Sequence, residues 1–204
     1  YGPQLTNQAQ LKDLELWEEL LQQVSKKGVD INNITFTSPT HTTYSDACEH
    51  GIGGFCTNGM AWRYELPNDM IGQHSINLLE FLAAAVTILI VMLDTNAPTK
   101  ILAFTDNSSA LGWLYKASFG SNQVDHDNIA RWLARELVQR DSALYSQHIK
   151  GSHNFVADSL SRDTHIAADK LTFSLRNLFL EQIPTNFNIS PPPPESLCLI
   201  RSLS

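Results

Sequence analysis

The sequence predicts an α/β domain in which helices cover a mixed sheet. Three observations carry this prediction. Residues 41–67 combine β-branched and aromatic residues with glycines, the pattern of three short strands joined by tight turns. Residues 100–107 form a short, nearly continuous apolar run, as expected of a central strand. Helical patterns then alternate with a further short strand, and this alternation is typical of layered α/β folds.

Between residues 41 and 162 the predicted order of elements is β-β-β-α-β-α-α-β-α. Residues 76–93 predict a long helix, and its most apolar stretch, 81–93, is too short to span a bilayer. We therefore interpret it as a buried core helix. The elements after the central strand are a helix at 108–117, a polar loop at 118–127, a helix at 126–141, a strand at 143–151 and a helix at 154–162 with Asn154 as its N-cap.

The two ends of the chain differ in character from its middle. Residues 5–27 carry an amphipathic helical pattern that stops at Gly28. Residues 168–183 could form one more amphipathic helix, and Pro191 to Pro194 an extended polyproline segment within a linker or the start of another module. We therefore divide the chain into an N-terminal helix and linker (1–39), a central domain (40–165) and a C-terminal helix with a Pro-rich tail (166–204).

Composition limits the class of protein. The 204 residues are 43% hydrophobic, which is enough for one sizeable core. The net charge of −7 means that any binding to nucleic acid must be local, weak or assisted by a neighbouring domain. The three cysteines form no close pair, which indicates a reducing compartment, the cytoplasm or nucleus. No secretory leader is recognisable, and we expect no membrane partner.

Four acidic residues fall where such a fold would bring them together. Asp46 lies in the first strand and Glu80 in the first turn of the long helix. Asp106 ends the central strand, and Asp158 lies near the start of the helix that follows the last strand. In open α/β sheets, binding and catalytic residues are usually found at the ends of strands and the starts of helices. Glu80 and Asp158 are also embedded among apolar residues, where an ionised carboxylate is costly unless it is paired or binds a metal.

Four convergent carboxylates cannot all stay ionised without a cation. Two Mg²⁺ or Mn²⁺ ions, roughly 4 Å apart, would relieve the repulsion, activate a water molecule and stabilise the leaving oxygen of a phosphodiester. Each acid also has an ordinary interpretation by itself, as a turn residue (Asp46), a residue favoured at a helix start (Glu80), a helix cap (Asp106) or a solvated helix residue (Asp158). The prediction depends on their joint order and spacing.

The blocks that carry these acids are YSDACEHGIGGF, INLLEFLAAAVTIL, LAFTDNSSALGWL and HIKGSHNFVADSLSR. In this order they resemble the acid-bearing blocks of the ribonuclease H (RNase H) family, over about residues 40–163. The ending N-x-x-AD-x-LSR is similar to the form found in retroelement polyproteins. Residues 13–32 also look like the junction that follows reverse transcriptase in such polyproteins. The resemblance implies an RNase H-like fold, a five-stranded mixed sheet flanked by helices.

By position, the resemblance makes Asp46, Glu80, Asp106 and Asp158 the catalytic residues that bind two Mg²⁺ or Mn²⁺ ions. It also implies substrate contacts. Asn77 would read the minor groove, and Asn107 and Ser108 would contact substrate, although all three could equally be capping residues. The backbone at Gly54 could approach the nucleic acid or form a plain turn. His153 could assist proton transfer or product release, or be an ordinary loop histidine.

The implied activity is endonucleolytic hydrolysis of the RNA strand of an RNA–DNA hybrid, leaving 5′-phosphate and 3′-hydroxyl ends. The implied partner is the polymerase domain of a reverse transcriptase in the same polyprotein. Arg131 and Arg135, one helical turn apart, could follow a phosphate backbone or lie on a solvated helix face. Two other interpretations stay open: a catalytically silent RNase H-like connector within a polymerase, and a transposase or integrase core of the same fold.

Overall fold

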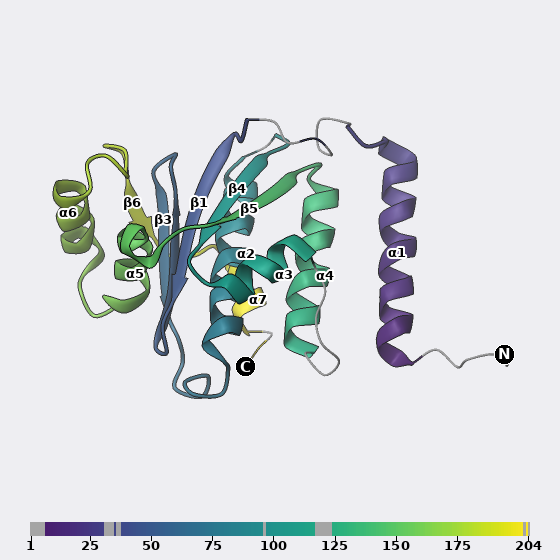
Figure 1. Ribbon diagram of the computed structural model, residues 1–204, viewed down its shortest axis with the longest axis horizontal. Coiled ribbons are helices and arrows are strands. Elements are labelled where there is room, and N and C mark those ends of the chain that lie inside the picture. Colours follow the sequence, from purple (N-terminus) through teal and green to yellow (C-terminus); the bar gives the residue numbers. More distant parts are fainter. Residues whose placement is uncertain are drawn as a thin grey trace, which may run out of the picture.

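A computed structural model of the chain describes residues 7–30, 35, 38–95, 97–116, 124–201 and 203. Within them lies a six-stranded sheet of order β5-β4-β1-β2-β3-β6, seen nearly edge-on in Figure 1. The strands β1, β2 and β3 are antiparallel neighbours, β4 and β5 run parallel to β1, and β6 runs parallel to β3. The strands are β1 (His41–Ala47), β2 (Gly51–Cys56), β3 (Met60–Glu65), β4 (Lys100–Thr105), β5 (Ala143–His148) and β6 (Asn188–Ser190).

Helices cover both faces of this sheet (Figure 1). One face carries α2 (Ile76–Asp94), α3 (Ser108–Lys116), α4 (Val124–Gln139) and α7 (Pro194–Arg201). The other carries α5 (Phe155–Arg162), which follows a short 3₁₀ turn at Gly151–His153, and α6 (Ala168–Leu178). The N-terminal α1 (Gln8–Lys27) lies outside α4 (Figure 1). Of the predicted loop at 118–127, residues 118–123 lie outside the described residues.

The period-two alternation of strand β2 separates the two layers. Ile52 faces α2 and its neighbours, whereas Phe55 packs against the residues of α5 and α6. The glycines follow the same rule: a Cβ at Gly53 would lie 2.7 Å from Leu160 of α5, and one at Gly54 would lie 2.2 Å from Thr87 of α2. The glycines therefore let helices pack closely on both faces of the central strands.

Helix α2 is the central core helix, as its sequence predicts. By length and composition it could cross a membrane, but 83% of its most apolar window is buried inside the protein. Burial of this kind is typical of a helix in a protein core. The helix begins at an N-cap, Ser75, whose side chain accepts a hydrogen bond from the amide of Leu78.

The C-terminal tail departs from the prediction. Instead of forming a linker, it adds β6 to the edge of the sheet and packs α7 against α2. Phe187, Ile189, Leu199 and Ile200 are all buried. The sheet therefore has six strands rather than five, because apolar residues of the tail cover an edge that would otherwise expose unpaired backbone groups. The helix predicted at 168–183 also ends earlier, at Leu178.

Two ion pairs link helix α1 to α4. Arg131 pairs with Asp13 at 2.9 Å and Arg135 pairs with Glu19 at 2.8 Å. Both arginines that could follow a phosphate backbone are therefore engaged by acidic residues of α1. Along the outer side of α1, the side chains of Leu11, Leu14, Trp17 and Leu21 are exposed.

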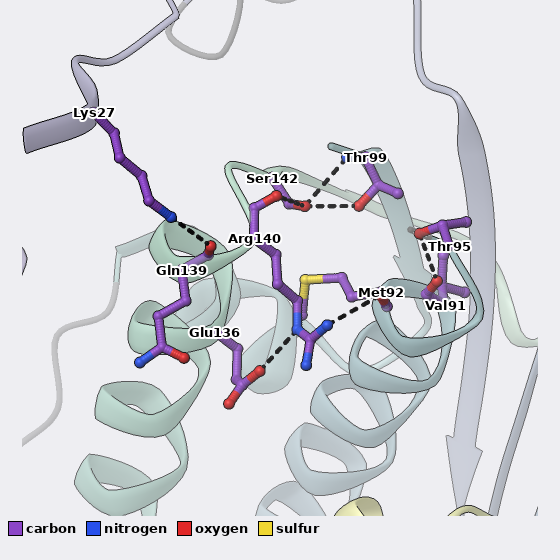
Figure 2. A network of polar contacts seen from close by, with 9 residues as sticks. All are labelled: Lys27, Val91, Met92, Thr95, Thr99, Glu136, Gln139, Arg140 and Ser142. Carbon is purple, nitrogen blue, oxygen red and sulfur yellow. Dashed lines mark hydrogen bonds and ion pairs between the residues drawn. The ribbon is translucent and has the colours of Figure 1, made fainter. Parts of the chain in front are cut away.

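Polar contacts join the C-terminal ends of α1, α2 and α4 (Figure 2). They lie at the end of the molecule where strand β4 begins. Arg140 pairs with Glu136 and also donates to the carbonyl of Met92, near the end of α2. Lys27 donates to the carbonyl of Gln139, the last residue of α4. These bonds satisfy carbonyl groups that a helix C-terminus leaves without partners.

Candidate metal centre

Three of the four predicted acids come together where β1 and β4 end. Asp46 lies near the end of β1, Asp106 directly follows β4, and Glu80 projects from α2. One ligand oxygen from each of the three lies within 4.8 Å of those of the other two. The parallel pairing of β1 with β4 places their carboxyl ends side by side, and α2 packs across β1. Glu80 is the fifth residue of α2 and so lies in its second turn, not in the first as the sequence suggests.

Asp46 is buried and is held from the opposite face of the sheet. Its side chain is 4% exposed, and Ser161 Oγ lies 2.5 Å from Asp46 Oδ2. Burial, together with the nearby carboxylates of Asp106 and Asp158, raises the pKa of Asp46 to about 6, and the Ser161 hydrogen bond opposes the shift. This carboxyl group therefore loses its proton much less readily than an exposed aspartate.

Glu80 is the one acid of the four with a buried carboxyl oxygen that lacks a hydrogen-bond partner among the described residues. It is 5% exposed, and its carboxyl group accepts a hydrogen bond from the backbone of Ala47. Its other oxygen, Oε2, is buried and has no hydrogen-bond partner among the residues that the structure describes. Burial, then the charges of Asp46 and Asp106, raise the pKa of Glu80 to about 9.

These observations fit a site for a divalent cation. Buried carboxyl oxygens without partners are costly, and neighbouring carboxylates repel one another. A cation among Asp46, Glu80 and Asp106 would satisfy Glu80 Oε2 and reverse the repulsion. Since all three donors are carboxylate oxygens, the set suits hard ions such as Mg²⁺ or Mn²⁺.

Asp158, the fourth predicted acid, lies beside this group rather than in it. It projects from the first turn of α5 and pairs with Arg162 at 2.5 Å. Its charge contributes to the raised pKa of Asp46, so the two carboxyl groups are near neighbours. The structure thus brings three acids within ligand distance of one another and places the fourth next to them, paired with an arginine.

Two of the predicted substrate-binding residues contact each other next to the acids. Asn107 Nδ2 donates to Asn77 Oδ1 at 2.8 Å. The oxygen of Asn107 also accepts the backbone amides of Ser109 and Ala110, which makes Asn107 the cap of α3. Asn77 is not a cap, because Ser75 occupies that position in α2. Ser108 is exposed at the first position of α3.

The other two predicted contacts have less structural support. Gly54 is a strand residue rather than part of a turn, and the approach of Thr87 explains by itself why a glycine stands there. His153 is exposed at the end of the 3₁₀ turn. That turn begins at Gly151, where a Cβ would lie 3.0 Å from Asp106 Oδ2, so it lies beside the acids. Substrate contact by Gly54 or His153 stays a prediction.

Two further residues hold the acids in place, although the sequence motifs do not mark them as functional. Ser161 and Arg162 hold Asp46 and Asp158, and both belong to the quoted ending ADSLSR. The spacing from Asp158 was an available signal, because residues three and four positions apart share a helix face. Asn154, predicted as a cap, makes no capping bond with its side chain. Instead, its Nδ2 donates to the carbonyl of Ser45, next to Asp46.

No protein-family model matches the sequence, and no curated protein matches it. Solved structures do match. The LC11 RNase H1 in complex with an RNA/DNA hybrid is 18% identical, with a TM-score of 0.50, over 64% of this chain and 98% of that one. RNase H1 from the halophilic archaeon Halobacterium salinarum is 19% identical, with a TM-score of 0.48, over 61% and 96% of the two chains.

A prototype foamy virus protease–reverse transcriptase is 16% identical, with a TM-score of 0.42, over 68% of this chain and 22% of that one. At such identities, similarity establishes the fold alone. Together with the mixed sheet flanked by helices, the match to the LC11 enzyme shows that this chain has the RNase H-like fold.

Proposed function

We propose that the protein is a ribonuclease H, an endonuclease that hydrolyses the RNA strand of an RNA–DNA hybrid. The observation that carries the proposal is the cluster of Asp46, Glu80 and Asp106, in which the buried Glu80 Oε2 lacks a partner. A cluster of this kind at the strand ends of an α/β sheet is suited to divalent ions and phosphate chemistry. The LC11 enzyme, which shares the fold, was solved with an RNA/DNA hybrid.

In this proposal each acid has a stated role. Asp46, Glu80 and Asp106 would hold two Mg²⁺ or Mn²⁺ ions, and Asp158 would complete the set on the side of α5. When bound, the ions would supply activation of water and stabilisation of the leaving oxygen. Ser161 orients Asp46, and Arg162 holds Asp158 through their ion pair.

The substrate would lie across the end of the sheet at which β1 and β4 finish, next to the acids. Asn77 would contact the minor groove of the hybrid, where the 2′-hydroxyl marks the RNA strand. His153, exposed on the turn beside Asp106, would assist proton transfer or product release. Ser108, exposed at the start of α3, would add a contact to the sugar–phosphate backbone.

The proposal includes a setting for the domain. From the resemblance of its sequence motifs, we place it in the reverse transcriptase polyprotein of a retroelement, inside the cell. Residues 40–165 would carry the catalytic residues, and residues 1–39 would be the junction that follows the polymerase domain. Residues 166–204 would be the C-terminal helix and the tail that completes the sheet of the catalytic domain. The negative net charge supports this setting, because a neighbouring polymerase domain would add phosphate contacts to the local ones that this chain makes.

The decisive experiment is cleavage of a labelled RNA–DNA hybrid by the full chain, with Mg²⁺ and with Mn²⁺. Asp46→Asn removes one ligand charge and should abolish cleavage. Asp169→Asn makes the same chemical change on the exposed side of α6 and should leave cleavage intact. DNA duplex and RNA duplex of the same sequence serve as substrate controls.

Metal-dependent cutting of the RNA strand alone, lost in Asp46→Asn and kept in Asp169→Asn, supports the proposal. No cutting with either metal by protein that melts cooperatively would overturn it in favour of a silent connector. Cutting or joining of DNA duplex would favour a transposase or integrase core instead.

A further inference from the structure

A chain of hydrogen bonds beside the acids orients two asparagine side chains. The backbone amides of Ser109 and Ala110 donate to Asn107 Oδ1 at 3.0 and 2.9 Å. Asn107 Nδ2 in turn donates to Asn77 Oδ1 at 2.8 Å. The chain thus runs from the start of α3 to the first turn of α2.

The direction of this chain follows from its chemistry. A backbone amide can only donate, so the oxygen of Asn107 must face α3 and its nitrogen must face Asn77. A side-chain NH₂ can only donate as well, so Asn77 must turn its oxygen toward Asn107. The NH₂ group of Asn77 is then directed away from Asn107. It donates no hydrogen bond to the residues that the structure describes, which leaves it available to a ligand.

We propose that Asn107 is a positioning residue that locks Asn77 as a hydrogen-bond donor toward the minor groove of a bound hybrid. This inference rests on the proposed function. Asn77 lies one helical turn before Glu80, and Asn107 directly follows Asp106, so the amide pair flanks the acids. A scissile phosphate held at the acids would therefore bring the wide, shallow minor groove of the neighbouring base pairs to Asn77.

A side chain fixed as a donor explains how the site could bind the minor groove without a preference for base sequence. Every base pair presents acceptors in the minor groove, but only pairs that contain guanine also present a donor, the N2 amino group. A group that can only donate accepts every base pair, whereas a group that can only accept would favour guanine. Asn107 thus decides between a sequence-tolerant and a guanine-selective site.

The test uses a variant that reverses the orientation of the Asn77 side-chain amide. In Asn107→Asp, a carboxylate oxygen still accepts from Ser109 and Ala110, so the cap of α3 is kept. The carboxylate cannot donate to Asn77, so Asn77 turns its NH₂ group toward it and presents its oxygen to the groove. Steady-state cleavage is measured on two hybrids that differ only in guanine or hypoxanthine near the cut, because hypoxanthine lacks the amino group.

The wild type should cut the hypoxanthine hybrid at least as well as the guanine hybrid. Asn107→Asp should shift the ratio of KM values toward guanine by about 3- to 10-fold, the effect of one hydrogen bond. Because both hybrids carry the same phosphates, the added negative charge of the variant cancels in this ratio. Asn77→Asp, which presents an acceptor by a different route, should shift the ratio in the same direction.

Asn107→Ser is the matched control, since serine also caps a helix but leaves Asn77 free to turn either way. It should raise KM for both hybrids without a preference. If the wild type cuts hybrid but Asn107→Asp keeps the wild-type ratio and melting temperature, the positioning role is overturned while the proposed function stands. If the wild type neither binds nor cuts hybrid, both fail together.

Discussion

At the scale of single residues, Glu80 links the site to the stability of the fold. Its pKa is about 9 in the folded protein against 4.5 when exposed, so the folded state holds the proton more tightly than the unfolded state. The free energy of unfolding without metal should therefore fall as pH rises from about 4.5 to 9. Asp46, with its pKa raised to about 6, contributes in the same direction over the lower part of this window.

Glu80→Gln should remove most of this pH dependence, because glutamine is close in shape to the protonated acid. At pH 8 with a chelator, we expect the variant to be more stable than the wild type by about 1–3 kcal/mol. Thermal melts between pH 5 and 9 measure this. A wild type that gains stability as pH rises across this range would contradict the assigned burial of Glu80.

Divalent cations should reverse this instability. Mg²⁺ that binds only the folded state stabilises it by mass action, so the melting temperature of the wild type at pH 8 should rise with ion concentration. Glu80→Gln and Asp46→Asn should lose most of that rise, whereas the surface variant Asp169→Asn should keep it. Melting temperature is independent of turnover, so an equal rise in all four proteins would place the ion elsewhere.

At the scale of elements, Gly54 sets the distance between α2 and the sheet. A Cβ there would lie 2.2 Å from Thr87 Oγ1 and 2.8 Å from the carbonyl oxygen of Tyr44. The Tyr44 carbonyl belongs to the backbone, so it cannot move aside as the end of a flexible side chain can. Gly54→Ala should therefore lower the free energy of unfolding by about 1–3 kcal/mol. The same change at Gly112 of α3 meets nothing within 4 Å and should instead stabilise by about 0.5–1 kcal/mol.

Urea unfolding of the two alanine variants measures the contrast. A Gly54→Ala protein as stable as the wild type would mean that α2 can retreat from β2 at little cost. In that case a backbone contact to nucleic acid would become the better explanation for the glycine.

At the scale of the whole molecule, the two ends of the chain are attached differently. The tail contributes a strand and buried apolar residues to the core, whereas α1 is attached by two ion pairs and by apolar residues that are only half-buried, such as Leu20 and Val24. Surface ion pairs stabilise by about 0–1 kcal/mol each, far less than a set of buried apolar side chains. Removal of residues 1–37 should therefore leave a cooperative melt close to that of the full chain.

Removal of residues 186–204 should have the opposite result. It uncovers the edge of β3 and exposes the partners of Ile189, Leu199 and Ile200, so we expect aggregation or a non-cooperative melt. Calorimetry of both truncated proteins makes the comparison. A tail deletion that melts like the full chain would show that the first five strands suffice, as the sequence alone suggests.

The types and order of the elements between residues 41 and 162 follow from local sequence, because periodicity and turn residues act over only a few positions. The order of the four acids likewise points to a metal site at the strand ends. Local patterns do not reveal the partners of those acids. The contact of Ser161 with Asp46 spans 115 positions, and the bond from Asn107 to Asn77 spans 30.

Hydrophobic pattern and acid spacing, read along the chain, were thus sufficient to predict an α/β domain with a candidate metal site. Three-dimensional packing decided that the tail completes the sheet, that Gly54 faces a helix, and that Asp158 stands beside the other acids with Arg162 as its partner. The reason is physical: periodicity reports which face of an element is apolar, but not which distant element will cover it.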